Sequence, residues 1–431
     1  MCLIRWCALS TLTQTTLNEL FGKNINPMKI LFISQLYDPE YSIKGHALMK
    51  HWVDQGHEVE VITTFPNYPV GKVYDGYKVK LVDESYEDQV KITRVWSHIS
   101  HSKSKLSRAW SYISFTLMAL LFALKSKNVS VVYTYHPQST TGLIGMLMTL
   151  FKRVPYLTDV QDLWPDSLSA TGLGSNKIVT SLIGGWCRLV YKFSSQVIVL
   201  SEGFKKALIE RGVKEDKIHV VYNWCPEEAL ISSALEQATY TVTSNPTVKL
   251  AYAGNLGAAQ DLKSVIQAMR LLGDVDVHLS LIGGGVEREA LEKEVKDLEL
   301  KNVDFLGYVP PKDLFSELVN YDALLVHLRD EPLFKITIPS KTQSYTALAK
   351  PIIMAVSGET QDIIREGECG YYPTPSNPES IADAIRSLSN GRDDWASLGS
   401  NSRRTYLRKF SLESGYRSLD SVLKKAVSHE S

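Results

Sequence analysis

The stretch KLAYAGNLG, residues 249–257, joins a short apolar run to a glycine loop, and a helical pattern of apolar residues follows from Asp261. A strand, a glycine turn and a helix in this order place backbone N–H groups and a positive helix end beside a bound anion. Residues 29–34, KILFIS, open the same pattern early in the chain, with a polar loop to Gly45 after them. The repetition predicts two facing α/β domains with a ligand between them.

Strand-like and helix-like runs alternate along most of the chain, which favours parallel sheets covered by helices. The expected strands are residues 29–34, 58–64, 91–95, 131–135, 155–160, 197–200, 219–222, 249–253, 278–282, 303–306, 323–326 and 352–355. A polar, weakly periodic stretch begins near residue 225 and reads as the connection between domains. We therefore expect domains at residues 28–225 and 226–408 and a final helix at 409–431. Residues 1–27 are interpreted as a disordered extension or a mis-assigned start.

The bulk composition removes support from several functional classes. A formal net charge of zero gives no argument for a nucleic-acid partner. The five cysteines are scattered and lack a close pair, which suits reduced thiols in the cytoplasm. The chain has no HExxH motif, CxxC pair, Walker lysine or nucleophile-elbow serine, so metal hydrolysis, thiol redox and serine-hydrolase chemistry lose support. We expect no metal and no cofactor.

One apolar segment bears on membrane association. Residues 110–124 are shorter than the roughly 20 apolar residues that a spanning helix needs, and serines interrupt them. Lys103, Lys105 and Arg108 precede the segment. It is interpreted either as a core helix or as a helix whose basic edge rests on anionic lipid.

Two segments of the second half are suited to an anion. The run PSKTQSY, residues 339–345, predicts a helix that Ser340 caps, with Lys341 in the first turn. A cation there is unfavourable unless it faces an anion such as a diphosphate, although a solvated lysine beside an ordinary cap is the alternative. The glycines of residues 283–285 end the strand 278–282, where backbone geometry alone also accounts for them.

The run DVQDLWPD, residues 159–166, follows a strand end, which is where ligands bind in open α/β sheets. Its three carboxylates, a glutamine and a tryptophan are suited to a polyhydroxyl substrate. Asp162 and Asp166 are also suited to capping the next helix. His136, at the end of the strand 131–135, is a further candidate or a structural histidine.

Several segments, taken in order, resemble the family-four glycosyltransferases of the GT-B fold. The resemblance is closest to the bacterial O-antigen, capsule and colanic-acid subgroup, which includes WbuB-like N-acetylfucosamine transferases. The segments are residues 33–40 (ISQLYDPE) with Gly45, 56–59 (GHEV), 66–69 (PNYP) with Gly71 and residues 76–77, 162–166 (DLWPD), 254–257 (GNLG) and 338–341 (IPSK) leading to 350–351. The resemblance implies two Rossmann-like domains around a central cleft and a C-terminal helix that crosses back to the first domain.

The resemblance also implies an activity. Such an enzyme moves a sugar, here an N-acetylated amino or deoxyamino sugar, from a UDP-sugar with retention of configuration. The acceptor would be an undecaprenyl-diphosphate-linked sugar at the inner face of the inner membrane, in the synthesis of lipopolysaccharide O-antigen or capsule. The UDP-sugar is a substrate, so no cofactor follows.

The resemblance assigns roles to residues in both domains. Lys341, Asp162 and Gly45 form the implied catalytic group, with Lys341 as the main diphosphate contact. The implied donor-binding residues are Gly254, Asn255, Leu256, Gly257, Gly283, Gly284, Tyr308, Val309, Pro339, Ser340, Gln343 and Ser344. The implied acceptor-binding residues are His136, Gln161, Trp164 and Asp166.

Five positions depart from the family pattern. Asn255 and Gln260 stand where many relatives carry arginine and lysine, Ile336 and Ser344 where they carry two glutamates, and Gln161 where they often carry histidine. These losses keep two alternatives open: a nucleotide-sugar epimerase of the same fold, and a non-catalytic nucleotide- or glycan-binding protein.

Overall fold

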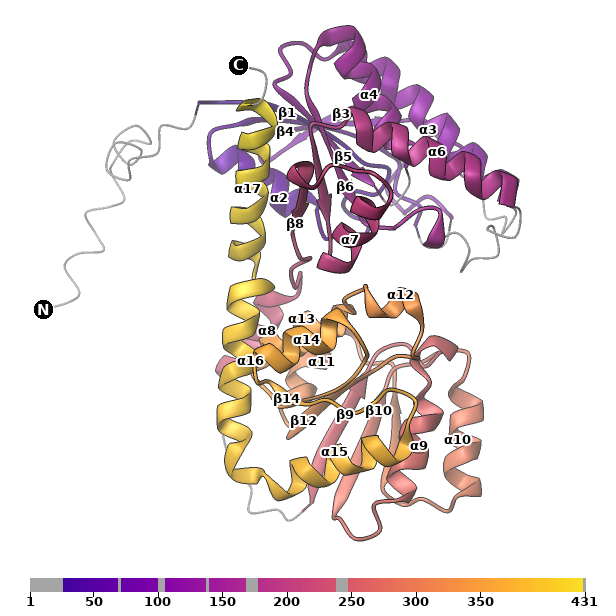
Figure 1. Cartoon of the computed structure of the whole chain (residues 1–431). Helices are drawn as coiled ribbons and strands as arrows, with labels where there is room; N and C mark the ends of the chain where they lie inside the picture. Colours follow the sequence, from indigo (N-terminus) through magenta and orange to yellow (C-terminus); the bar gives the residue numbers. More distant parts are fainter. Residues whose placement is uncertain are drawn as a thin grey trace, which may run out of the picture. The chain divides into compact units, whose positions relative to one another are not determined.

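The computed structural model describes residues 26–68, 71–99, 105–136, 139–167, 177–237 and 247–428. The segment predicted to be an extension, residues 1–27, lies almost wholly outside this part of the chain. Contacts divide the chain into two compact units, residues 1–135 with 140–156, and residues 136–139 with 157–431. The predicted α/β class is confirmed, because the strands form two mainly parallel sheets and helices flank each sheet (Figure 1).

The first sheet has the strand order β3-β4-β2-β1-β5-β6-β7-β8. Its strands are β1 (Lys29–Ile33), β2 (Glu58–Thr64), β3 (Val82–Glu87), β4 (Val90–Val95), β5 (Val131–His136), β6 (Tyr156–Val160), β7 (Gln196–Val199) and β8 (Ile218–Val220). The strand β3 pairs antiparallel with β4 at the edge of the sheet, whereas β1 runs parallel to both of its neighbours. Apolar runs such as KILFI are buried along nearly their whole length, as expected for parallel strands.

Five helices accompany these strands: α2 (His46–Asp54), α3 (Lys105–Lys125), α4 (Thr141–Lys152), α6 (Lys177–Phe193) and α7 (Glu202–Glu210). The helix α2 buries Leu48, Met49 and Trp52, whose spacing of three to four residues places them on one face. The helices α3 and α4 pack against each other (Figure 1). Within the described ranges, no helix is both long and apolar enough to cross a membrane.

The second sheet has the order β11-β10-β9-β12-β13-β14, and all of its pairs are parallel. Its strands are β9 (Val248–Ala253), β10 (Val277–Ile282), β11 (Val303–Gly307), β12 (Ala323–His327), β13 (Ile352–Ala355) and β14 (Gly370–Tyr371). Alternate residues of β9 enter two different cores. Leu250 and Tyr252 belong to one core, and Ala251 and Ala253 belong to the other.

The helices divide between these two cores. The helices α9 (Leu262–Arg270), α10 (Arg288–Asp297) and α15 (Pro378–Asn390) contribute to the first. The helices α8 (Glu228–Gln237), α11 (Pro311–Leu318), α13 (Ser340–Ala347), α14 (Glu359–Glu366) and α16 (Trp395–Lys409) contribute to the second. A sheet covered in this way is open to a ligand only at the ends of its strands.

The last helix, α17 (Leu412–Ser428), follows α16 (Figure 1). It packs against β7. A Cβ atom at Gly415 would overlap the indole of Trp224, so glycine permits a close approach of this helix. The ring of Tyr416 meets the same indole edge-on, with 5.1 Å between the ring centroids. These aromatic contacts anchor the C-terminal helix to the segment that follows β8.

Candidate active site

Two glycine turns meet at the carboxyl ends of β9 and β10. Gly254 and Gly283 have φ values of 145° and 133°, which side chains of L-residues rarely permit. The Gly254 N–H donates to the Ile282 carbonyl at 2.8 Å, and the Gly283 N–H donates to the Gly307 carbonyl at 2.7 Å. A Cβ atom at Gly283 would overlap the Gly254 carbonyl oxygen. The two glycine segments that the sequence suggested separately are therefore one structure.

The loop after Gly254 is closed by the side-chain amides of Asn255 and Gln260, the two residues predicted to replace cations of the family pattern. The Asn255 amide donates to Gln260 Oε1 at 3.2 Å, and the Gly257 N–H donates to the same oxygen at 3.2 Å. The Ser376 N–H donates to His327 Nε2 at 3.1 Å, so Nδ1 carries the proton and donates to the Gln260 carbonyl at 2.7 Å. Burial lowers the pKa of His327, which favours this neutral form. Asn255 and Gln260 thus shape the loop rather than add charge to it.

Lys341 lies in the first turn of α13 and faces this loop. A Cβ atom at Gly254 would lie 2.6 Å from Lys341 Nζ, so the ammonium packs directly against the backbone of this glycine. The same Nζ lies 4.9 Å from the centre of the Tyr252 ring. None of the ion pairs formed among the described residues includes Lys341, and burial lowers its pKa to about 8. A partly desolvated cation beside a glycine loop is suited to a bound anion.

The start of α13 differs from the prediction. Pro339, not Ser340, occupies the N-cap, and no side chain caps the helix. The Thr342 N–H donates to the Pro339 carbonyl instead, at 2.9 Å. In the amide orientation that satisfies both of its atoms, the buried Gln343 donates to the Pro339 and Ser340 carbonyls at 2.8 Å each. The predicted cap is therefore wrong, because the proline places the turn one residue earlier.

Other predicted donor residues take different positions. The Ser344 hydroxyl donates to the Lys341 carbonyl at 3.3 Å and thus stays within α13. Tyr308 follows β11 and is 76% exposed, whereas Val309 is partly buried against the second core. The Tyr345 hydroxyl accepts from the Ala253 N–H at 2.8 Å, which fixes α13 to the end of β9. The positions of Lys341 and the glycine loop are therefore set by one side chain that the sequence did not single out.

Three of the four predicted acceptor residues hold their own segment together. The Gln161 amide donates to Asp159 Oδ1 at 2.6 Å and accepts from the Asn223 amide at 3.1 Å. The Arg211 guanidinium pairs with the Asp166 carboxylate and donates to the Trp164 carbonyl, the latter at 2.9 Å. These contacts account for the Gln161 and Asp166 side chains and for the Trp164 carbonyl without a ligand.

Asp162 is different from its neighbours. Among the described residues, no side chain donates a hydrogen bond to its carboxylate, and it keeps exposed surface. Desolvation by the surrounding protein raises its pKa. Asp162 is therefore free to meet a substrate hydroxyl.

Gly45 precedes α2 in the other unit. A Cβ atom there would overlap the Asp38 carboxylate, which accepts from the His46 N–H at 2.6 Å. The buried Glu40 carboxylate accepts from the backbone N–H groups of residues 67 and 68, at 2.6 and 2.7 Å. The resemblance segments 33–40 and 66–68 therefore meet in a network that shapes the turn at Gly45.

Four predicted residues lie wholly or in part outside what the structure describes. Lys103 lies outside the described residues. The side chains of Lys105 and Arg108, in the first turns of α3, and of His136, the last residue of β5, also lie outside them. Their predicted roles stay predictions.

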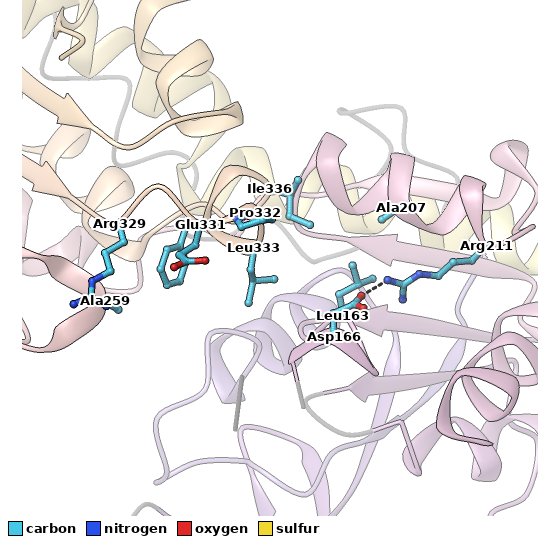
Figure 2. Close-up of a pocket in the computed structure, with 11 residues that line it drawn as sticks. Leu163, Asp166, Ala207, Arg211, Ala259, Arg329, Glu331, Pro332, Leu333 and Ile336 are labelled. Carbon is cyan, nitrogen blue, oxygen red and sulfur yellow. Dashed lines mark hydrogen bonds and ion pairs between the residues drawn. The ribbon is translucent and has the colours of Figure 1, made fainter. Parts of the chain in front are cut away.

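A pocket of about 650 Å³ adjoins the loop after Gly257 (Figure 2). It is lined by Leu163, Asp166, Ala207, Arg211, Ala259, Arg329, Glu331, Pro332, Leu333, Phe334 and Ile336. Ala259 belongs to the short turn Ala258–Gln260, and residues 332–335 form the helix α12 (Pro332–Lys335). The Arg329 N–H donates to the Ala259 carbonyl at 3.0 Å, which joins this wall to the glycine loop. The pocket brings the predicted acceptor residue Asp166 near segments predicted to bind the donor.

Besides Tyr345, sequence reasoning missed three residues that shape the site. Tyr252 supports Lys341, His327 holds Gln260, and Arg211 holds Asp166. Tyr252 and His327 lie in buried strands, where alternation signals only a core position. Arg211 follows a helix, and no local pattern there indicates its partner.

Two mainly parallel sheets, with glycine turns at strand ends beside a lysine that forms no ion pair within the described ranges, are typical of nucleotide-binding proteins of the two-domain GT-B class. Two family models match the chain: the glycosyl transferase 4-like domain at residues 46–224, and the glycosyl transferases group 1 at residues 242–405. The chain therefore belongs to the group 1 glycosyltransferases of the GT-B type, as the resemblance implied.

Relatives and solved structures agree with this family. A probable glycosyltransferase, WbjE of Pseudomonas aeruginosa, is 23% identical over 58% of this chain, and the match spans 64% of WbjE, just under two thirds of its length. The putative colanic acid biosynthesis glycosyl transferase WcaI of Escherichia coli K12 is 26% identical over 69% of this chain and 73% of its own. The structure of Anabaena HepE in complex with UDP covers 92% of this chain and 100% of its own, with 16% identity and a TM-score of 0.65.

Proposed function

We propose that the protein transfers a sugar from a UDP-sugar to an undecaprenyl-diphosphate-linked acceptor in the synthesis of a surface polysaccharide. The observation that carries the proposal is Lys341, whose ammonium lies over Gly254 with no carboxylate partner among the described residues. The diphosphate of a nucleotide sugar supplies the missing negative charge. The UDP held by Anabaena HepE and the colanic acid role in the name of WcaI support this choice of donor and product.

The chemistry proceeds with retention and needs no protein nucleophile. The bond between the anomeric carbon and the diphosphate oxygen breaks, and the acceptor hydroxyl forms the new bond on the same face of the sugar. The acceptor proton passes to the departing diphosphate. Lys341 and the backbone N–H groups at the glycine turns stabilise the charge that develops on the leaving group. Asp162 accepts a hydrogen bond from the acceptor hydroxyl and orients it.

We also propose that the protein works at the inner membrane surface, where α3 makes the contact. Five large apolar residues spaced three or four apart are exposed along this helix: Leu106, Trp110, Ile113, Leu117 and Leu121, with 82%, 48%, 46%, 52% and 54% of their surface accessible. Residues 89–158 contain nine lysines and arginines and no aspartate or glutamate. An apolar helix face in a cationic segment is suited to anionic lipid. In this proposal the apolar face inserts, and the predicted basic residues Lys103, Lys105 and Arg108 assist it.

The test is a transfer assay with the full chain. A panel of UDP-sugars is incubated with undecaprenyl-diphosphate-linked sugars in anionic vesicles, and we expect glycosylated lipid together with released UDP. The donor is expected to be an N-acetylated amino or deoxyamino sugar, as in the WbuB-like subgroup. An epimerised UDP-sugar formed without acceptor would instead identify an epimerase and defeat the proposal.

A pair of lysine variants tests the assigned role of Lys341. Lys341→Met removes the charge that meets the leaving diphosphate, so we expect turnover to fall about 100-fold or more. Lys293→Met changes an exposed lysine of α10 and is expected to keep full activity. Circular dichroism confirms that both variants fold. Equal activity of the two variants would remove Lys341 from the mechanism.

A further inference from the structure

The pocket beside the glycine loop has an unusual lining for a sugar site. Seven of its eleven lining residues carry apolar side chains: Leu163, Ala207, Ala259, Pro332, Leu333, Phe334 and Ile336. Figure 2 shows Leu333 lying between Arg329 on one wall and Leu163 on the other. A volume of about 650 Å³ lies within the range of small-molecule sites. The space is therefore large enough for a hexose together with a substituent.

The charged groups of the lining lie toward its two ends. At one end Asp166 and Arg211 form an ion pair, and Arg211 also donates to the Trp164 carbonyl. At the other end are Arg329 and Glu331, whose side chains form no ion pair with any described residue. The middle of the pocket thus presents hydrocarbon. A hydroxyl placed there would lose its water without gaining a partner, which is costly, whereas a methyl group placed there is stabilised.

The wall of the pocket is continuous with the donor segments at both of its ends. Arg329 is hydrogen-bonded to Ala259, which lies two residues beyond Gly257. Ile336 lies at the other end of the wall, shortly before the segment 338–341 that contains Lys341. The Ile336 carbonyl accepts a hydrogen bond from the Ser201 hydroxyl at 2.6 Å. The pocket therefore adjoins both donor segments, and under the proposed function the group that enters it is a substituent of the donor sugar.

We propose that this pocket recognises a methyl-bearing substituent, an acetamido group or a 6-deoxy carbon, on the donor hexose, and that Leu333 determines this specificity. The inference rests on the proposed function, because it takes the donor to be a UDP-sugar. The position of Ile336 agrees with it, because the lining carries a branched hydrocarbon there and no hydrogen-bonding side chain.

The test compares the dissociation constants of UDP, UDP-glucose, UDP-N-acetylglucosamine and UDP-6-deoxyglucose by calorimetry on the full chain. At least one methyl-bearing donor is expected to bind about 10-fold or more tightly than UDP-glucose, since a buried methyl group discriminates by roughly that factor. Tighter binding of UDP-N-acetylglucosamine identifies the acetamido group as the recognised substituent, and tighter binding of UDP-6-deoxyglucose identifies the 6-deoxy carbon. Equal affinities of the three sugars, in a protein that binds UDP, overturn the inference alone. Failure to bind UDP overturns the proposed function as well.

Two variants change the pocket in opposite ways. Leu333→Asn makes the lining polar and is expected to reduce the preference below about threefold, with the affinity for UDP unchanged. Ala207→Leu fills the pocket with a larger side chain, so we expect weaker binding of the methyl-bearing donor and unchanged binding of UDP. This variant tests the pocket if Leu333→Asn does not fold. The matched control is Leu407→Asn, which changes a half-exposed leucine of α16 outside the lining. A preference that survives in both folded pocket variants overturns the role of Leu333 and of the pocket.

Discussion

The pKa of Lys341 predicts how the affinity for UDP changes with pH. Burial lowers this pKa from 10.5 to about 8. One pKa unit corresponds to about 1.4 kcal/mol, so withdrawing water from the ammonium costs roughly 3 kcal/mol in the free protein. A bound diphosphate offsets this cost, because it stabilises the charged form and raises the pKa again. Binding of UDP above pH 8 is therefore expected to be accompanied by proton uptake.

The direction in which the affinity for UDP changes follows from two pKa values of Lys341, that of the free protein and the higher one with a diphosphate bound. Below pH 8 the free protein already holds the ammonium, and the affinity is at its maximum and nearly constant. As the pH rises through 8, the free lysine becomes neutral, so the affinity falls by up to about tenfold for each pH unit. Between pH 7 and 9.5 we expect a loss of roughly 30-fold. The second ionisation of a phosphate, near pH 6, is complete over this range and does not contribute.

The measurement is a calorimetric titration with UDP from pH 7 to 9.5, repeated at pH 8.5 in two buffers with different ionisation enthalpies. The difference between the buffers gives the number of protons taken up. Lys341→Met is expected to bind UDP weakly with a flat pH profile, whereas Lys293→Met should keep the wild-type slope. The reasoning is refuted if the wild-type affinity changes less than twofold, or if Lys341→Met shows the same decline.

Three other perturbations follow from the contacts. Glu359 accepts hydrogen bonds from two N–H groups at the start of α7, both at 2.8 Å. Glu359→Ala should therefore lower the unfolding free energy, measured in urea titrations, by about 1–3 kcal/mol. Glu366→Ala, on the exposed face of α14, should leave the unfolding free energy unchanged. Gly283→Ala would force a Cβ atom onto the Gly254 carbonyl and should abolish UDP binding measured by calorimetry; retained affinity would contradict the glycine-turn geometry. Leu117→Asp in α3 should weaken sedimentation with anionic vesicles without changing the melting temperature, and unchanged sedimentation would argue against insertion of this face.

Most of the fold could be predicted because its strands are short apolar runs between turn residues. All twelve expected strands are present with ends shifted by at most two residues, for example β2 at Glu58–Thr64. The strand β3 was missed since its sequence VDESYE is polar and largely exposed, and this edge strand pairs only with β4. The strand β14 was missed because it has two residues. Both β3 and β14 form because they pair with neighbouring strands of their sheets.

The candidate site was predictable in its position but not in its contacts. A glycine turn after a strand and a lysine at a helix start are local patterns, so Gly254 and Lys341 were found. Their juxtaposition depends on Tyr345, which joins β9 to α13 across 92 residues. The sequence also predicted a capping serine at residue 340, whereas Pro339 begins the turn. Contacts between distant segments set these details, and no local pattern contains them.

The neutral loop at residues 254–260 has a consequence for the end of the catalytic cycle. With Asn255 and Gln260 bonded to each other, the described part of this loop presents backbone N–H groups and the charge of Lys341 to a diphosphate. A nucleoside diphosphate product held by one formal cation dissociates faster than one held by three, and its affinity depends less steeply on salt. Product release limits the rate of many enzymes. The scarcity of formal charge in this loop therefore favours rapid escape of a nucleoside diphosphate product and weak product inhibition.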